Sequence, residues 1–216
     1  MTRGRSAALL TGALVVGLTL SGCGSVVEGT STAALPSDRP ADLGELERLL
    51  VSEVPSGLPR LPDHEVQPPA GAKRPEDVAG YSTDPARELA VLADYGYRFG
   101  WERFWGRGGG PMTGVFVDQF ERRAGARKYA GDLAVNKAEL VGRALSEDPP
   151  DLPANCRELT VAEPVPEAEL GEPAAFAWCW HGVFSVAVTA VGPTVDDALA
   201  EVSSVMGRQL AQLPPG

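Results

Sequence analysis

The chain has 216 residues, with 19 basic and 29 acidic side chains and a formal net charge of −10 at pH 7. This acidic balance disfavours binding to nucleic acid, or to an anionic membrane surface, through overall electrostatic attraction. We therefore expect no nucleic-acid partner.

The first 22 residues have the pattern of an export signal. Arg3 and Arg5 form a basic start, and residues 7–20 form an apolar run. As a helix this run would reach about 21 Å, short of the roughly 30 Å hydrocarbon core of a bilayer. A short apolar region between basic charge and small residues is typical of a secretory signal peptide.

The tetrapeptide "LSGC" (residues 20–23) resembles the lipobox of bacterial lipoproteins. The resemblance implies that signal peptide 1–22 is removed and that the thiol of Cys23 carries diacylglycerol. The protein would then be held at the extracytoplasmic face of the cell membrane, because two or three acyl chains, at about 0.8 kcal/mol per buried CH₂, anchor a protein stably. An ordinary signal with an incidental cysteine is the alternative.

Behind this signal the sequence predicts one tether and one domain. Residues 24–40 are small, polar and aperiodic, so the lipidated cysteine and a flexible tether are expected over 23–41. The folded domain is expected over 42–216, a length suited to a single hydrophobic core.

Two further cysteines, Cys156 and Cys179, are expected to form a disulfide. An even number of cysteines outside the cytoplasm favours pairing. Metal binding is the alternative, but it would need more soft ligands, and His64 and His181 are the only histidines. We expect neither a metal nor a cofactor.

Apolar spacing and capping residues predict both helices and strands in the domain. Asp42 with Glu45, and Thr194 with Asp197, have the spacing of a capping box. The predicted helices cover residues 42–54, 85–94, 122–141 and 194–213, and a proline-rich extended stretch follows the first of them. The predicted strands cover residues 95–105, 112–120, 157–163, 174–180 and 183–191, with a turn at 106–111 between the first two. This order predicts an α+β fold, an antiparallel sheet covered by helices with a long C-terminal helix.

Aromatic residues concentrate in "YGYRFGWERFW" (residues 95–105), where five of six occupy odd positions and would share one face of a strand. Such a face is usually core, covered by a helix. A pocket for an apolar ligand is the other interpretation, with Arg98 and Arg103 as its polar end. The candidate ligand-binding residues are Tyr97, Phe99, Trp101, Trp105, Trp178 and Trp180.

The segments "GYRFGWERFW" and "VFVDQFERRAGARKY", followed by late paired cysteines and a long final helix, resemble an uncharacterised actinobacterial (mycobacterial-type) lipoprotein family. The resemblance implies an α+β domain similar to PsbP/Mog1-like or sensor domains, which serve in binding, assembly or sensing. It brings no catalytic residues with it.

Motifs for catalysis are missing from the sequence. "GRGGGP" (residues 106–111) lacks the Lys-Ser or Lys-Thr of a phosphate loop, and no G-x-S-x-G elbow is present. We therefore expect no enzyme, but a lipid-anchored binding or interaction module whose partner is a small apolar ligand or an envelope protein. A carrier of lipids or other apolar envelope molecules is the alternative, and a hydrolase comes third.

Overall fold

The computed structural model describes residues 39–107, 110–168 and 170–216. The predicted signal peptide 1–22, the predicted lipidation site Cys23 and the predicted tether up to residue 38 lie outside the described residues. Asp38–Gly216 form one compact unit, and every buried apolar residue described belongs to it. We therefore expect residues 39–216 to fold without the preceding segment.

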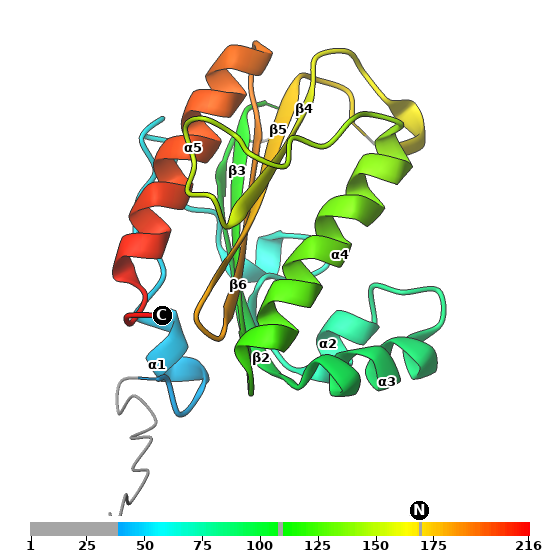
Figure 1. The fold of residues 1–216 in the computed structure, drawn as a ribbon. Coiled ribbons are helices and arrows are strands. Elements are labelled where there is room, and N and C mark those ends of the chain that lie inside the picture. Colours follow the sequence, from blue (N-terminus) through cyan, green and yellow to red (C-terminus); the bar gives the residue numbers. More distant parts are fainter. Residues whose placement is uncertain (1–38, 108–109, 169) are drawn as a thin grey trace, which may run out of the picture. The chain divides into compact units, whose positions relative to one another are not determined.

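A six-stranded antiparallel sheet forms the centre of the domain (Figure 1). Its strands lie in the order β1-β2-β3-β6-β5-β4. The predicted α+β fold is confirmed. The strands are β1 (Gly71–Lys73), β2 (Tyr97–Gly106), β3 (Met112–Phe120), β4 (Cys156–Val161), β5 (Ala174–His181) and β6 (Phe184–Val191).

Five helices surround the sheet, and the capping residues define where several of them begin. Asp42 accepts from the backbone N–H of Glu45, and Thr194 from that of Asp197, as their spacing predicts. The helices are α1 (Leu43–Glu47), α2 (Pro75–Ala79), α3 (Pro85–Tyr95), α4 (Arg123–Val141) and α5 (Val195–Gln212), with single 3₁₀ turns at Asp63–Glu65 and Pro166–Ala168. The first helix is shorter than predicted and ends at Glu47. No helix in the described ranges is both long and apolar enough to cross a membrane.

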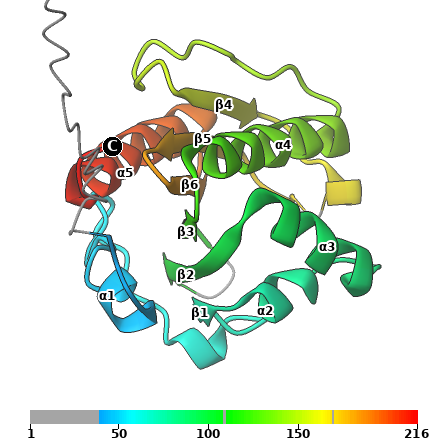
Figure 2. The same cartoon turned by 60° about the horizontal axis from the view of Figure 1, so that its bottom comes forward.

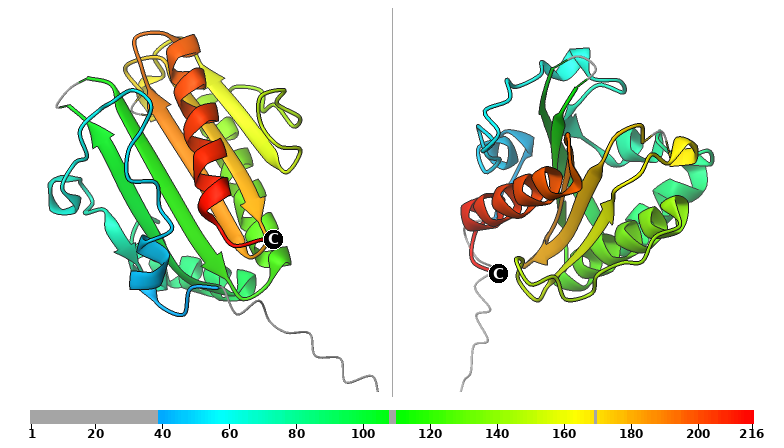
Figure 3. Two further views of the ribbon diagram at one scale, coloured as in Figure 1. Left: turned by 90° about the vertical axis from the view of Figure 1, so that its left-hand side faces the viewer. Right: turned by 90° about the horizontal axis from the view of Figure 1, so that it is seen from above.

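The helices divide between the two faces of the sheet. Figure 2 shows α1 and α5 on one side and α2, α3 and α4 on the other, and Figure 3 shows α5 running along the strands. The α5 face buries the main core, which includes Trp105, Val115 and Val117. Gln209 of α5 is fully buried there. Its side-chain amide accepts a hydrogen bond from the backbone N–H of Val51 and donates one to the carbonyl of Leu49.

The α4 face holds two smaller cores. One joins α4 to β4 and β5 through Phe176 and Trp178. The other joins α2, α3 and the start of α4 through Tyr97, Phe120 and Tyr129.

The expectation that the odd-numbered aromatic residues of 95–105 share one face is wrong for two of them. Tyr95 is the last residue of α3. A register shift between Tyr97 and Phe99 then places Tyr97 against Phe120, on the α4 face. Such a bulge inserts one residue into the strand, so the alternation of faces reverses across it. Trp101 and Trp105 remain on the α5 face.

The predicted disulfide is present between Cys156 and Cys179. The two cysteines are directly opposed in β4 and β5, and both side chains are buried in the main core. The bond therefore fastens the edge strand β4 to the sheet.

Candidate functional site

A groove crosses the α4 face of the sheet where the helices leave β2, β3 and β6 open. We call it the sheet groove, and its volume is about 410 Å³. A second hollow of about 860 Å³ adjoins it and shares Tyr81, Glu102 and Phe116. The groove is lined by Val78, Tyr81, Glu102, Phe116, Asp118, Tyr129, Leu133, Asn136, Lys137, Leu140, Phe176, Trp178, Ala187 and Thr189.

The walls of the sheet groove are mainly apolar and aromatic. Phe176 and Trp178 stack with their ring centres 5.8 Å apart, which makes a flat wall on β5. Phe116 meets Phe104 edge to face at 5.4 Å on the other side. Apolar walls with a few placed polar groups are typical of small-molecule sites.

Asp118 is the first of two carboxylates on the floor of the groove. Its Oδ1 accepts a hydrogen bond from the Tyr97 hydroxyl at 2.9 Å. Burial, and secondarily the negative charge of Glu102, raise the pKa of Asp118 to about 7. The carboxylate fits there because its neighbour on β2 is Gly100, where a Cβ would lie 2.1 Å from Oδ1.

Glu102, the second carboxylate, is held in a closed network. Lys73 lies 3.2 Å from it, and both side chains of this ion pair are buried. The Tyr81 hydroxyl donates to both carboxylate oxygens, at 3.0 and 3.2 Å. Burial raises the pKa of Glu102, and the Lys73 charge opposes that rise. Glu102 is thus occupied by Lys73 and Tyr81, whereas Asp118 accepts one hydrogen bond, from Tyr97. Asp118 is therefore the better candidate of the two to accept a hydrogen bond from a ligand.

Lys137 is the one cationic side chain in the lining of the sheet groove. Its Nζ lies 5.0 Å from the centre of the Phe176 ring, and burial lowers its pKa. The groove thus offers a carboxylate at its floor and an ammonium on the α4 wall.

The rims carry exposed apolar side chains. Tyr81 and Leu140 line the groove itself and are 49% and 55% exposed, and Met112, 37% exposed, lines the adjoining hollow. Among the described residues only Leu89 and Val135 are comparable large apolar side chains with such exposure. Clustering of this kind marks a binding surface more than scattered exposure does.

The structure separates the six aromatic residues predicted to bind a ligand. Trp178 alone lines the sheet groove, and Tyr97 lies behind its floor carboxylate. Phe99, Trp101 and Trp105 belong to the core on the opposite face. Trp180 lines another pocket, on the far side of α4. The six therefore do not form one aromatic wall.

The two arginines of the aromatic strand do not form the polar end of a groove. Arg103 is buried on the α5 face and donates to the carbonyl of Val51 at 2.8 Å. Arg98 is exposed, with its guanidinium 5.0 Å from the centre of the Phe99 ring.

Sequence reasoning did not find Glu102, Asp118 or Lys137. A signal for Asp118 exists, because in "VFVDQF" it shares strand parity with Phe116 and Phe120, a parity that faces the core. Burying a carboxylate on an apolar face costs stability unless it is hydrogen-bonded or paired, so an aspartate at such a position marks a candidate functional residue.

The described residues contain no group of three or more His, Cys, Asp or Glu side chains able to hold a metal ion. His64 is exposed, and His181 Nε2 lies 2.9 Å from the carbonyl of Pro214.

Comparisons with known proteins identify a fold relative and no family. No family model matches the chain, and no curated protein matches it. Among solved structures, the extracellular domain of PknH from Mycobacterium tuberculosis superimposes with a TM-score of 0.51 at 13% identity, over 81% of this chain and 97% of that domain. At this identity the likeness concerns the fold alone, and it agrees with the α+β fold that the sequence predicts.

Proposed function

We propose that this protein is a non-catalytic, extracytoplasmic binding module whose ligand occupies the sheet groove. The observation that carries the proposal is the groove itself, where apolar walls and exposed apolar rims surround a floor carboxylate with a single hydrogen-bond donor. The disulfide and the fold shared with an extracellular domain support a location outside the cytoplasm. Lipidation at Cys23 would hold the module at the membrane.

The ligand that fits these walls is a small amphipathic molecule. Its apolar body would lie between Phe116 and the Phe176–Trp178 wall, and a hydroxyl or amine would donate to Asp118. A volume of about 410 Å³ lies within the range of roughly 300–1,000 Å³ that is usual for small-molecule sites. Its apolar lining also favours the second candidate, a carrier of apolar envelope molecules.

Calorimetric titration of residues 39–216 with n-octylamine and octanoate tests the proposal, because the two probes share a chain and differ in head group. We expect octylamine to bind more tightly at pH 8, where Asp118 is ionised. Asp118→Asn should weaken octylamine binding at least tenfold, and Leu140→Gln should weaken both probes. Val135→Gln is the matched control, since Val135 is an exposed α4 residue outside the groove. A preference for octanoate would place the head group at Lys137 and refute the role of Asp118. Binding of neither probe would refute the groove as the site.

A further inference from the structure

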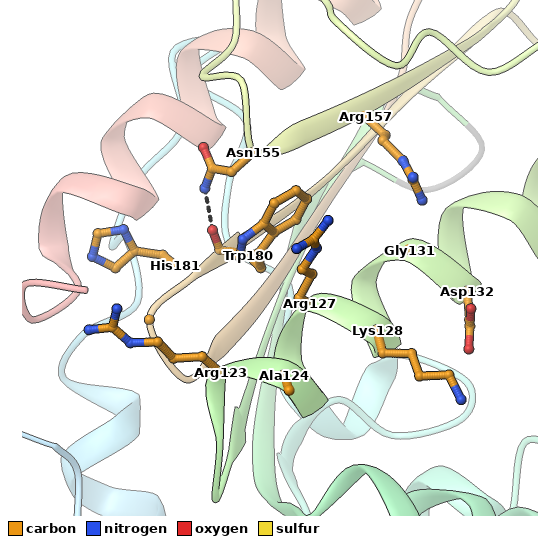
Figure 4. A pocket seen from close by; sticks show the side chains of 11 residues that line it. Arg123, Ala124, Arg127, Lys128, Gly131, Asp132, Asn155, Arg157, Trp180 and His181 are labelled. Carbon is orange, nitrogen blue, oxygen red and sulfur yellow. Dashed lines mark hydrogen bonds between the residues drawn. The ribbon is translucent and has the colours of Figure 1, made fainter. Parts of the chain in front are cut away.

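A basic pocket lies on the other side of α4 from the sheet groove, and the two share no residue. Its volume is about 710 Å³. Figure 4 shows Arg123 and Arg127 projecting from α4 beside the Trp180–His181 end of β5, with Arg157 projecting from β4. The remaining lining residues are Ala124, Lys128, Gly131, Asp132, Asn155 and Gly182.

The charge of this pocket is opposite to that of the chain. Four of the 19 basic residues line it with one acidic residue, Asp132, although the chain carries a net charge of −10. Asp132 accepts a hydrogen bond from the Tyr95 hydroxyl. Arg157 pairs with the exposed Glu147, whereas in the described part of the chain Arg123, Arg127 and Lys128 form no ion pair. Positive charge therefore remains uncompensated.

Arg123 places part of this positive charge at the start of α4, where it opposes helix stability. The helix α4 begins at Arg123, its N-cap Arg122 makes no side-chain capping bond, and no acidic residue occupies the first turn. The N-terminus of a helix already carries a partial positive charge, so cations there repel it. An arrangement that costs stability is expected at a site with another purpose.

The shape of the pocket is built by particular residues. At Gly131, inside α4, a Cβ would lie 2.8 Å from Arg157 Nη1, so glycine leaves the space that the guanidinium occupies. Glycine inside a helix costs about 1 kcal/mol relative to alanine. On the facing side, Arg127 lies over the Trp180 indole at 5.3 Å. Asn155 donates to the Trp180 carbonyl and ties the end of β5 to the segment before β4 (Figure 4).

We infer that this basic pocket binds a phosphate-bearing ligand through Arg123, Arg127 and Arg157, with Lys128 adding charge and Trp180 contacting the organic part. Guanidinium groups form paired hydrogen bonds with phosphate oxygens. The phosphate would come from a soluble phosphorylated molecule or from a phospholipid headgroup. Both kinds of phosphate fit a group of cations: a phosphate monoester carries a charge of about −1.5 to −2, and a phosphodiester headgroup presents the same kind of acceptor oxygens with a smaller charge.

Two titrations of residues 39–216 at low salt test this inference. The first uses inorganic pyrophosphate, and the second uses vesicles of phosphatidylglycerol compared with phosphatidylcholine. The pocket variant is Arg123→Gln with Arg127→Gln. Its charge-matched control is Arg87→Gln with Arg208→Gln, two exposed arginines outside the pocket.

We expect the pocket variant to weaken binding at least tenfold and the control to change it less than twofold. Pyrophosphate binding with that pattern indicates a soluble phosphorylated ligand, and binding to phosphatidylglycerol vesicles alone indicates a headgroup. Binding of neither probe, or an equal loss in both variants, would overturn the inference. The octylamine titration of the sheet groove is independent of these arginines, so either site can fail without the other.

Discussion

The Tyr97 hydroxyl on β2 donates a 2.9 Å hydrogen bond to Asp118 on the neighbouring strand β3. The bond fixes a carboxylate beneath an otherwise apolar groove, where burial raises its pKa to about 7. A buried carboxylate that is retained in this way costs stability whenever it is ionised.

The free energy of unfolding of the domain should therefore decrease as the pH rises towards the pKa of Asp118. Its pKa in the native state is about 7, whereas an unfolded aspartate has a pKa of about 3.9. Between these values the native state holds more protons, so the free energy of unfolding decreases from about pH 4 to about pH 7. We expect Asp118→Asn to be more stable than wild type at pH 8 and to lose this advantage towards pH 4.5.

Guanidinium denaturation at both pH values measures this difference. Asp94→Asn, at an exposed position on α3, is the control and should match wild type. Equal denaturation midpoints of Asp118→Asn and wild type at pH 8 would show that Asp118 titrates normally.

The affinity of the sheet groove for octylamine should depend on the ionisation of Asp118. If octylamine meets the ionised Asp118, its affinity should rise between pH 6 and pH 8 and level off above that range. Calorimetric titrations at several pH values measure the effect, and Asp118→Asn should remove it. A pH-independent affinity in wild type would place the amine elsewhere.

The disulfide should contribute a large share of the stability of the domain. Cys156 and Cys179 are 23 residues apart, and closing a loop of that length stabilises by about 3 kcal/mol in the chain-entropy model. Replacing both cysteines with alanine should lower the free energy of unfolding by about that amount. Denaturation of wild type with and without reductant gives an independent comparison, and an unchanged midpoint in both experiments would contradict the expectation.

The tryptophans should differ in energetic role according to where the sheet places them. Trp105 is 1% exposed in the main core, so Trp105→Ala should cost about 3–5 kcal/mol. Trp180 is half-buried at the edge of the basic pocket, so Trp180→Ala should cost clearly less. Equal losses in chemical denaturation would mean that Trp180 is also a core residue.

Local sequence signals predicted most elements of the fold, because caps and apolar spacing act within a few residues. Asp42 and Thr194 mark helix starts for this reason. The bulge after Tyr97 could not be predicted, because the alternation of side chains along a strand does not show where an extra residue is inserted. One bulge was enough to move Tyr97 to the opposite face.

The sites depend on which strands become neighbours, and a single strand pattern does not contain that information. Asp118 is accommodated by Gly100 only in the observed register of β2 and β3. The basic pocket needs β4 to return beside α4 so that Arg157 reaches Gly131. From the sequence alone, Asp118 is an aspartate in a predicted strand, and the arginines of the basic pocket are charged residues far apart along the chain.

The cationic start of α4 makes a final prediction about stability. Because Arg123 repels the positive end of the helix, Arg123→Gln should raise the free energy of unfolding by about 0.3–1 kcal/mol at low salt. Arg143 follows the C-terminal end of the same helix, where positive charge is favourable, and its side chain reaches the Gly142 carbonyl. Arg143→Gln should therefore lower stability slightly, and both effects should fade as salt is added. Thermal unfolding at 20 and 500 mM salt measures them, and destabilisation by Arg123→Gln would mean that Arg123 supports the fold.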